Sequence, residues 1–86
     1  MTDRPSLRRG IRLTYDHVRE THVLLFPEGV LMPNPTAVAV LELCDGVATV
    51  ADIAAKLSGR YSGVREQDVR DVLVKLADRK VVTWHD

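Results

Sequence analysis

The chain has 86 residues, 45% of them hydrophobic, and its 12 basic side chains balance 12 acidic ones, so the formal net charge is zero. A chain of this length forms one small domain that buries only about 60 to 65% of its unfolded surface. Proteins that bind nucleic acid usually carry clustered Lys and Arg and a basic net charge, which this composition lacks. Zero net charge also gives little repulsion between copies and so favours self-association.

The cysteine content and the first residues indicate a cellular location. Cys44 is the only cysteine, so no intramolecular disulfide can form, and a reducing compartment is expected. The arginines near the start, at positions 4, 8 and 9, are not followed by the apolar run of a signal peptide. No stretch approaches the roughly 20 apolar residues of a membrane span. We therefore expect a cytoplasmic protein that does not contact a membrane.

The first 15 residues divide into an arm and a strand. Residues 1–10 are polar, carry four charges and contain Pro5 and Gly10, so we expect a mobile arm followed by one domain over residues 11–86. Residues 11–15 alternate between apolar and polar side chains, which predicts a strand with one buried face.

A hairpin follows this strand. The apolar runs Val23–Phe26 and Val30–Met32 flank Pro27-Glu28-Gly29, whose residue types suit a type I turn. Pro33 has no amide hydrogen for a ladder and Pro35 stops further extension, so the second run must end abruptly. With the first strand, the hairpin predicts a three-stranded antiparallel meander.

The rest of the chain predicts three helices, which makes the fold class α+β. Asn34 suits the cap of a first helix that Asp45-Gly46 ends. Thr49 with Asp52 resembles a capping box for a helix over about residues 50–58. Ser62 or Gly63 is expected to cap the last helix, over about residues 64–80. The first helix carries a buried stripe of Ala37, Val40, Leu41 and Cys44.

Residues with catalytic potential do not form a recognisable group. Cys44 continues the buried stripe of the first helix, where a thiol is usually an inert small hydrophobe. His17, His22 and His85 lack the spacing of a metal site, and the glycines are too dispersed for a phosphate loop. We therefore expect no enzymatic activity, no metal and no cofactor.

Two kinds of binding stay open from the pattern alone. The last two helices imitate a helix-turn-helix that would enter a DNA groove, but five basic and four acidic residues alternate over positions 64–80, which disfavours contact with phosphates. The other candidate is the open edge at residues 30–32, which could accept an extended peptide as an added strand. The alternative to both is that the strand is short only because a longer open edge would aggregate. The domain would then be a structural interaction module.

Four blocks of residues together resemble the pyrroloquinoline quinone (PQQ) biosynthesis protein D family, or PqqD family. The likeness extends from about residue 11 to residue 82, and the LLFPEG and LCDG runs at their interval are its most specific part. The blocks are Val23 to Leu31, then Asn34, Thr36 and Ala37, then Leu43 to Gly46, and then Asp68 and Val69 with Leu73 and Leu76.

The resemblance implies a peptide chaperone that performs no chemistry itself. Such a domain has three strands followed by three helices in a winged-helix-like arrangement. It binds the leader of a ribosomally made precursor peptide, PqqA, and delivers it to the radical S-adenosylmethionine (SAM) enzyme PqqE. That enzyme joins a glutamate and a tyrosine of the peptide.

The resemblance also implies where the peptide binds. It would lie as an added strand between the third strand and the last helix, with Pro33 shortening the usable edge. Core burial stays open as an alternative for the apolar residues of the helix, and Asp45 with Gly46 either ends a helix or docks an enzyme. The implied walls are Val30, Leu31 and Met32 on the strand, and Val69, Val72, Leu73 and Leu76 on the helix, with Arg65, Lys75 or Arg79 available to acidic peptide residues.

Self-association is a further expectation. The segment Pro33-Asn34-Pro35 is a stiff hinge between an incomplete sheet and the helices, and small domains with such hinges can exchange elements between copies. We therefore consider a homodimer, domain-swapped or paired at its edges, as a hypothesis.

Overall fold

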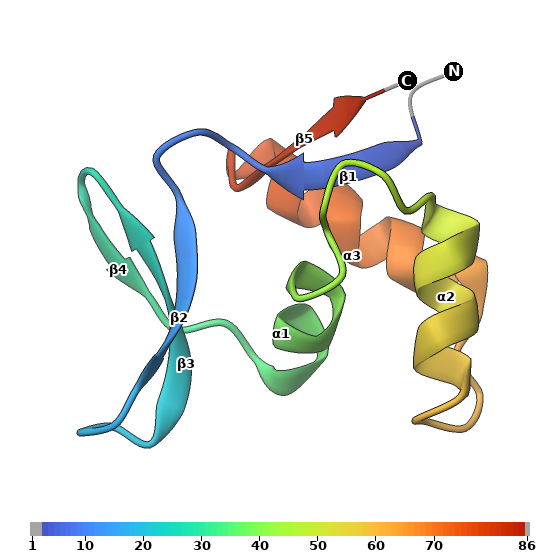
Figure 1. Cartoon of the computed structure of the whole chain (residues 1–86), viewed down its shortest axis with the longest axis horizontal. Helices are drawn as coiled ribbons and strands as arrows, with labels where there is room; N and C mark the ends of the chain where they lie inside the picture. Colours follow the sequence, from blue (N-terminus) through green and yellow to red (C-terminus); the bar gives the residue numbers. More distant parts are fainter. Residues whose placement is uncertain (1–2, 86) are drawn as a thin grey trace.

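A three-stranded antiparallel sheet and a group of three helices form most of the computed structural model, which describes residues 3–85 (Figure 1). The sheet has the spatial order β2-β3-β4, so strands that follow one another in sequence are neighbours. These bounds confirm the α+β class and the meander followed by three helices. The elements are β2 (Arg12–Asp16), β3 (Thr21–Phe26), β4 (Gly29–Leu31), α1 (Pro35–Leu41), α2 (Val50–Ser58) and α3 (Glu66–Asp78).

Local hydrogen bonds explain the two turns of the sheet. The Asp16 carboxylate accepts the amide of Val18 at 2.9 Å and pairs with the Arg19 guanidinium at 2.8 Å, which closes the turn between β2 and β3. Between β3 and β4, Phe26 pairs with Gly29 across a two-residue turn. The meander therefore follows from short-range sequence signals.

Side-chain caps start the first two helices as the sequence predicts. The side-chain oxygen Oδ1 of Asn34, directly before Pro35, accepts the Ala37 amide at 2.8 Å. Thr49 and Asp52 form a reciprocal capping box that starts α2. Both features satisfy amides that a helix leaves without partners in its first turn.

Two helix boundaries differ from the prediction. α3 begins after Arg65, whose amide donates to the Asp68 carboxylate at 3.3 Å, and not after Ser62 or Gly63. α1 ends at Leu41, four residues before Asp45, so the stripe predicted to include Cys44 extends past the helix. α1 ends early because the loop that follows it turns toward the N-terminal segment, where the Gly46 amide donates to the Pro5 carbonyl.

The N-terminal segment is not the mobile arm that we expected over residues 1–10. Residues 4–7 form strand β1 (Arg4–Leu7), which pairs antiparallel with β5 (Val82–His85) beside α3 (Figure 1). Pro5 on β1 is fully buried, and the Gly46 amide donates to its carbonyl at 2.9 Å. Asp3 forms an ion pair with Arg70 of α3 at 2.9 Å. Met1 and Thr2 lie outside the described residues.

One hydrophobic core joins the sheet to the helices. Leu24 of β3, Val40 of α1, Ile53 of α2 and Leu73 of α3 are all 0% exposed. Leu24 is the fully buried contribution of the sheet to this core, and Leu13, Phe26 and Leu31 pack against it partly buried. Within residues 3–85, none of the helices has the length and apolar character needed to cross a bilayer.

Removal of β1 tests the corrected boundary of the domain. Deleting residues 1–7 removes the β1–β5 pairing and the buried Pro5, and it should lower the free energy of unfolding by about 2 kcal/mol or more. Urea denaturation followed by circular dichroism measures this, with a deletion of residues 1–2 as the control. Equal stability of the two deletion variants would mean that β1 is dispensable.

Candidate functional site

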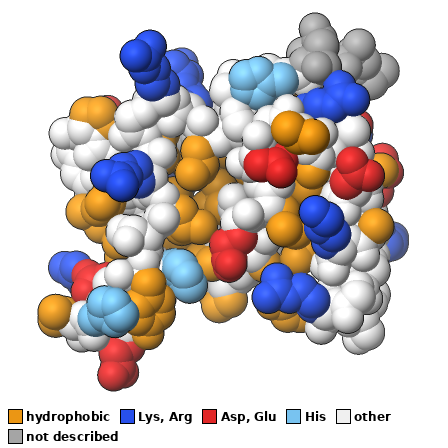
Figure 2. Space-filling view, viewed as in Figure 1, with side chains coloured by type: hydrophobic (Ala, Val, Ile, Leu, Met, Phe, Trp, Pro, Cys, Tyr) orange, Lys and Arg blue, Asp and Glu red, His pale blue; other side chains and the backbone are white. Residues whose placement is uncertain are grey.

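A groove lies between the open edge of the three-stranded sheet and the C-terminal half of α3. Its volume is about 830 Å³. On the side shown in Figure 2, hydrophobic side chains gather in the depression between the sheet and the helices. One wall of the groove comes from Leu31, Met32, Pro33, Asn34, Thr36 and Ala37, and the other from Val72, Lys75, Leu76, Asp78 and Arg79.

The backbone of β4 offers hydrogen bonds at this edge. A two-residue turn is closed by a hydrogen-bonded pair, here Phe26 and Gly29, and bonded and non-bonded pairs alternate along an antiparallel ladder. Val30, opposite Leu25, is therefore in a non-bonded pair, and its N–H and C=O point away from β3. These two groups are what an added strand needs.

Side-chain direction follows from the same register. Leu31 pairs with Leu24, and paired residues share one face of a sheet. Since Leu24 is fully buried against the helices, Leu31 also faces them, and it forms part of the groove wall. Val30 faces the other way and is 56% exposed.

α3 contributes an apolar wall with a cationic rim. Val72 is half-buried and Leu76 is 8% exposed, and both line the groove. Lys75 and Arg79 are exposed along the same wall, and neither forms an ion pair with any residue between 3 and 85. Asp78 is the only acidic residue of the lining, so the groove carries a small positive excess.

The structure brings together most of the residues that the sequence pointed to, but not all. Leu73 is 0% exposed in the core and does not line the groove, and Val69 lies 2% exposed beyond its end. Arg65 pairs with Asp68 at 3.3 Å at the start of α3, outside the groove. Met32 lines the groove but falls one residue after β4.

The start of α1 is the part of the groove that sequence reasoning missed. Asn34, Thr36 and Ala37 line the groove between β4 and α3. Pro33 and Pro35 carried the signal, because a chain that turns sharply after a strand must place the next helix beside the end of that strand. From the sequence, these prolines predicted the end of the strand and a stiff hinge, but not a contribution of the first helix to the groove.

Cys44 and the potential metal ligands among residues 3–85 were the remaining candidates for chemistry. Burial raises the pKa of the Cys44 thiol to about 12, and the thiol donates to the Val40 carbonyl at 3.2 Å, so it stays protonated and inert. In the described part of the chain, no three His, Cys, Asp or Glu side chains lie close enough together to hold a metal ion.

The LCDG run forms a turn and not the end of a helix. The Asp45 carboxylate accepts the amides of Val47 at 2.9 Å and Ala48 at 2.8 Å. Gly46 has φ of 80°, which an L side chain rarely adopts, and its amide donates to Pro5. The run therefore joins the loop after α1 to β1. Its amide hydrogen bonds lower the pKa of the Asp45 carboxyl below the ordinary value of 3.8.

The family model for coenzyme PQQ synthesis protein D (PqqD) matches residues 21–82, which include the sheet edge, the groove and all three helices. The chain belongs to the PqqD family. This match confirms the family resemblance.

Relatives and solved structures of the PqqD family agree with this assignment. The chain is 44% identical over 75 residues to the PqqA binding protein of Bradyrhizobium diazoefficiens. This alignment covers 87% of this chain and 73% of the relative. The solution structure of the PqqD part of PqqCD from Methylobacterium extorquens, described as a functional, stand-alone recognition element for ribosomally synthesised and modified peptides, superposes with a TM-score of 0.74 at 43% identity. That match covers 92% of this chain and 87% of the other.

A crystal structure of PqqD from Xanthomonas campestris is a more distant match. It superposes with a TM-score of 0.53 at 33% identity and covers 87% of each chain.

The turn at Asp45 generates a prediction about pH. Its folded-state pKa is lowered, so its contribution to stability is present above the unfolded pKa and is lost as the pH falls through the folded value. Asp45→Asn should therefore lower the melting temperature by a few degrees at pH 7, and the difference from the parent should shrink below about pH 4. Thermal scans from pH 3 to 7 measure this.

Glu28→Gln is the control for this prediction. Glu28 is exposed in the hairpin turn and accepts no hydrogen bond from the described residues. An Asp45→Asn difference that stays constant from pH 7 to pH 3 would contradict the role given to the carboxylate.

Proposed function

We propose that this chain binds the leader of the precursor peptide PqqA as an added strand on β4 and presents it to the radical SAM enzyme PqqE. One observation carries the proposal: the outward N–H and C=O of Val30 lie directly before Leu31 and Met32, which line a groove whose far wall on α3 is apolar with a cationic rim. Relatives that are called PqqA binding proteins support the choice of peptide.

Strand addition sets the direction of the peptide side chains. The peptide residue that pairs with Val30 exchanges backbone hydrogen bonds with it, and its side chain follows that of Val30 toward solvent. The residues on either side of it then point with Leu31 into the groove, toward Val72 and Leu76. Apolar residues at these alternate positions suit that wall.

The short edge requires help from side chains. β4 has only three residues, and Pro33 cannot donate, so few backbone hydrogen bonds are available. Lys75 and Arg79 add electrostatic attraction for an acidic peptide residue, because neither is engaged by an acidic side chain among residues 3–85. Together these contacts favour a leader that combines apolar and acidic residues.

Strand addition also suits presentation to an enzyme. A peptide bound through one backbone edge keeps its opposite edge and the segments beyond the groove free. The reacting part of the precursor can then enter the active site of PqqE while the leader stays bound. A homodimer paired through the β4 edges would compete with the peptide for Val30.

DNA binding is the weaker alternative. The cations near the start of α3 already have acidic partners: Arg65 pairs with Asp68, and Arg70 with both Asp3 and Glu66. A helix whose arginines are neutralised in this way offers little attraction to phosphates.

A proline at position 30 tests the proposal directly. Val30→Pro removes the outward N–H, which β3 does not use, so an edge strand should tolerate it while the peptide loses a donor. We expect at least a tenfold weaker affinity for the PqqA peptide of Bradyrhizobium diazoefficiens, measured by fluorescence anisotropy.

Val30→Thr is the matched control, because it keeps the amide and the branched side chain and should bind the peptide like the parent. Equal affinities of the proline and threonine variants would rule out strand addition at Val30. An absence of binding by the unaltered chain would contradict the proposed function itself.

A further inference from the structure

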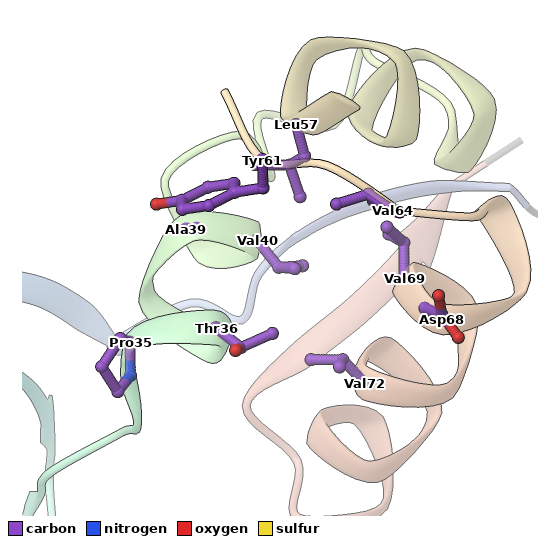
Figure 3. Close-up of a pocket in the computed structure, with 11 residues that line it drawn as sticks. Pro35, Thr36, Ala39, Val40, Leu57, Tyr61, Val64, Asp68, Val69 and Val72 are labelled. Atoms are coloured by element: carbon purple, nitrogen blue, oxygen red, sulfur yellow. The ribbon is translucent and has the colours of Figure 1, made fainter. Parts of the chain in front are cut away.

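A second apolar pocket continues the groove toward the start of α3. We call it the α1–α3 pocket, and its volume is about 320 Å³. Figure 3 shows Thr36 of α1 and Val72 of α3 facing one another at one end, and Tyr61 with Leu57 at the other. Val40, Val64 and Val69 lie between these ends.

The pocket and the groove are parts of one surface. Thr36 and Val72 line both of them, so the groove and the α1–α3 pocket adjoin at these two residues. The chain from Leu31 to Val40 also runs antiparallel to α3, since Leu31 lines the groove with the C-terminal half of α3 and Val40 lines the α1–α3 pocket with Val69. A peptide that extends beyond the Leu31 end of β4 therefore passes the mouth of the pocket.

The lining selects an apolar occupant. Apart from Thr36 and the Tyr61 hydroxyl, the only polar side chain is Asp68, which already accepts hydrogen bonds from the amide and guanidinium of Arg65. A charged or amide side chain would find no free partner of opposite charge there and would lose its hydration. A large aliphatic or aromatic side chain has no polar group to dehydrate, and it gains contact with the valines.

We propose that the α1–α3 pocket binds a large apolar side chain of the precursor peptide that occupies the groove. This inference rests on the proposed binding of that peptide at β4. It adds a second specificity position that lies away from the strand-pairing edge.

Helix geometry sets the spacing in the peptide between the residue in the α1–α3 pocket and an acidic residue that meets Lys75 or Arg79. Val69 in the pocket and Lys75 at the groove are six residues apart on α3, which is about 9 Å along the helix axis. An extended peptide advances about 3.3 Å per residue. The apolar residue therefore lies about three residues from an acidic residue that meets Lys75, or about four to five residues from one that meets Arg79.

Tyr61→Ala tests the pocket without disturbing the core, because Tyr61 is 52% exposed. We expect about fivefold or more weaker binding of the Bradyrhizobium diazoefficiens PqqA peptide, measured by fluorescence anisotropy. Tyr15→Ala is the matched control: Tyr15 is 43% exposed on β2, lines neither the groove nor the α1–α3 pocket, and should leave affinity unchanged.

A double-mutant cycle identifies the occupant. Each apolar residue of the peptide is replaced by alanine and measured against the unaltered chain and Tyr61→Ala. One replacement should weaken binding to the unaltered chain but have little further effect on Tyr61→Ala. A parallel cycle with Lys75→Gln and Arg79→Gln locates the acidic residue. Coupled positions that are adjacent, or far apart in the peptide, would overturn the spacing.

The outcomes separate this inference from the proposed function. If the unaltered chain binds the peptide and Val30→Pro weakens binding tenfold or more, but Tyr61→Ala binds normally with no coupled peptide position, the pocket is not used and the inference fails alone. If the unaltered chain does not bind the peptide, the proposed function fails and the inference fails with it.

Discussion

The groove exists because two prolines end β4 after three residues. Pro33 has no amide hydrogen with which to continue the ladder, and Asn34 caps α1 immediately afterwards, with Pro35 as its first residue. The chain therefore turns away from the sheet instead of adding another strand. The outer N–H and C=O of Val30 are left without a partner in the sheet.

Core packing turns this open edge into a site. Leu24 of β3 is fully buried with Val40 of α1 and Leu73 of α3, so the hairpin packs against the helices. This packing places β4 opposite the wall on α3. Leu73 supports this wall from behind, whereas Val72 and Leu76 form its surface.

Local signals predicted the local structure well. The Asn34 cap, the box of Thr49 with Asp52 and the turn at Pro27 each depend on a few neighbouring residues, and each lies where the sequence placed it. The β1–β5 pair was missed because two strands of four residues stabilise one another only after the chain ends meet. Neither strand is long enough to show the alternating pattern that would predict this pairing.

The site was predictable only in part, because local signals specify the short strand but not the packing of the helices. The short strand and its free edge follow from residues 30–35, and the family resemblance supplied the far wall. Helical periodicity placed Leu73 and Leu76 on one apolar stripe, but it cannot tell which of them is enclosed by the other helices. The role of Thr36 and the α1–α3 pocket depend on how α1 packs against α3, which no local pattern specifies.

Amide hydrogen exchange at Val30 is the most direct test of the account. The Val30 amide points away from β3, so it should exchange rapidly in the free protein and slow strongly when the PqqA peptide saturates the groove. The Leu31 amide already faces β3 and should change little, which makes it an internal control. Unchanged exchange at Val30 in the presence of bound peptide would contradict strand addition at this edge.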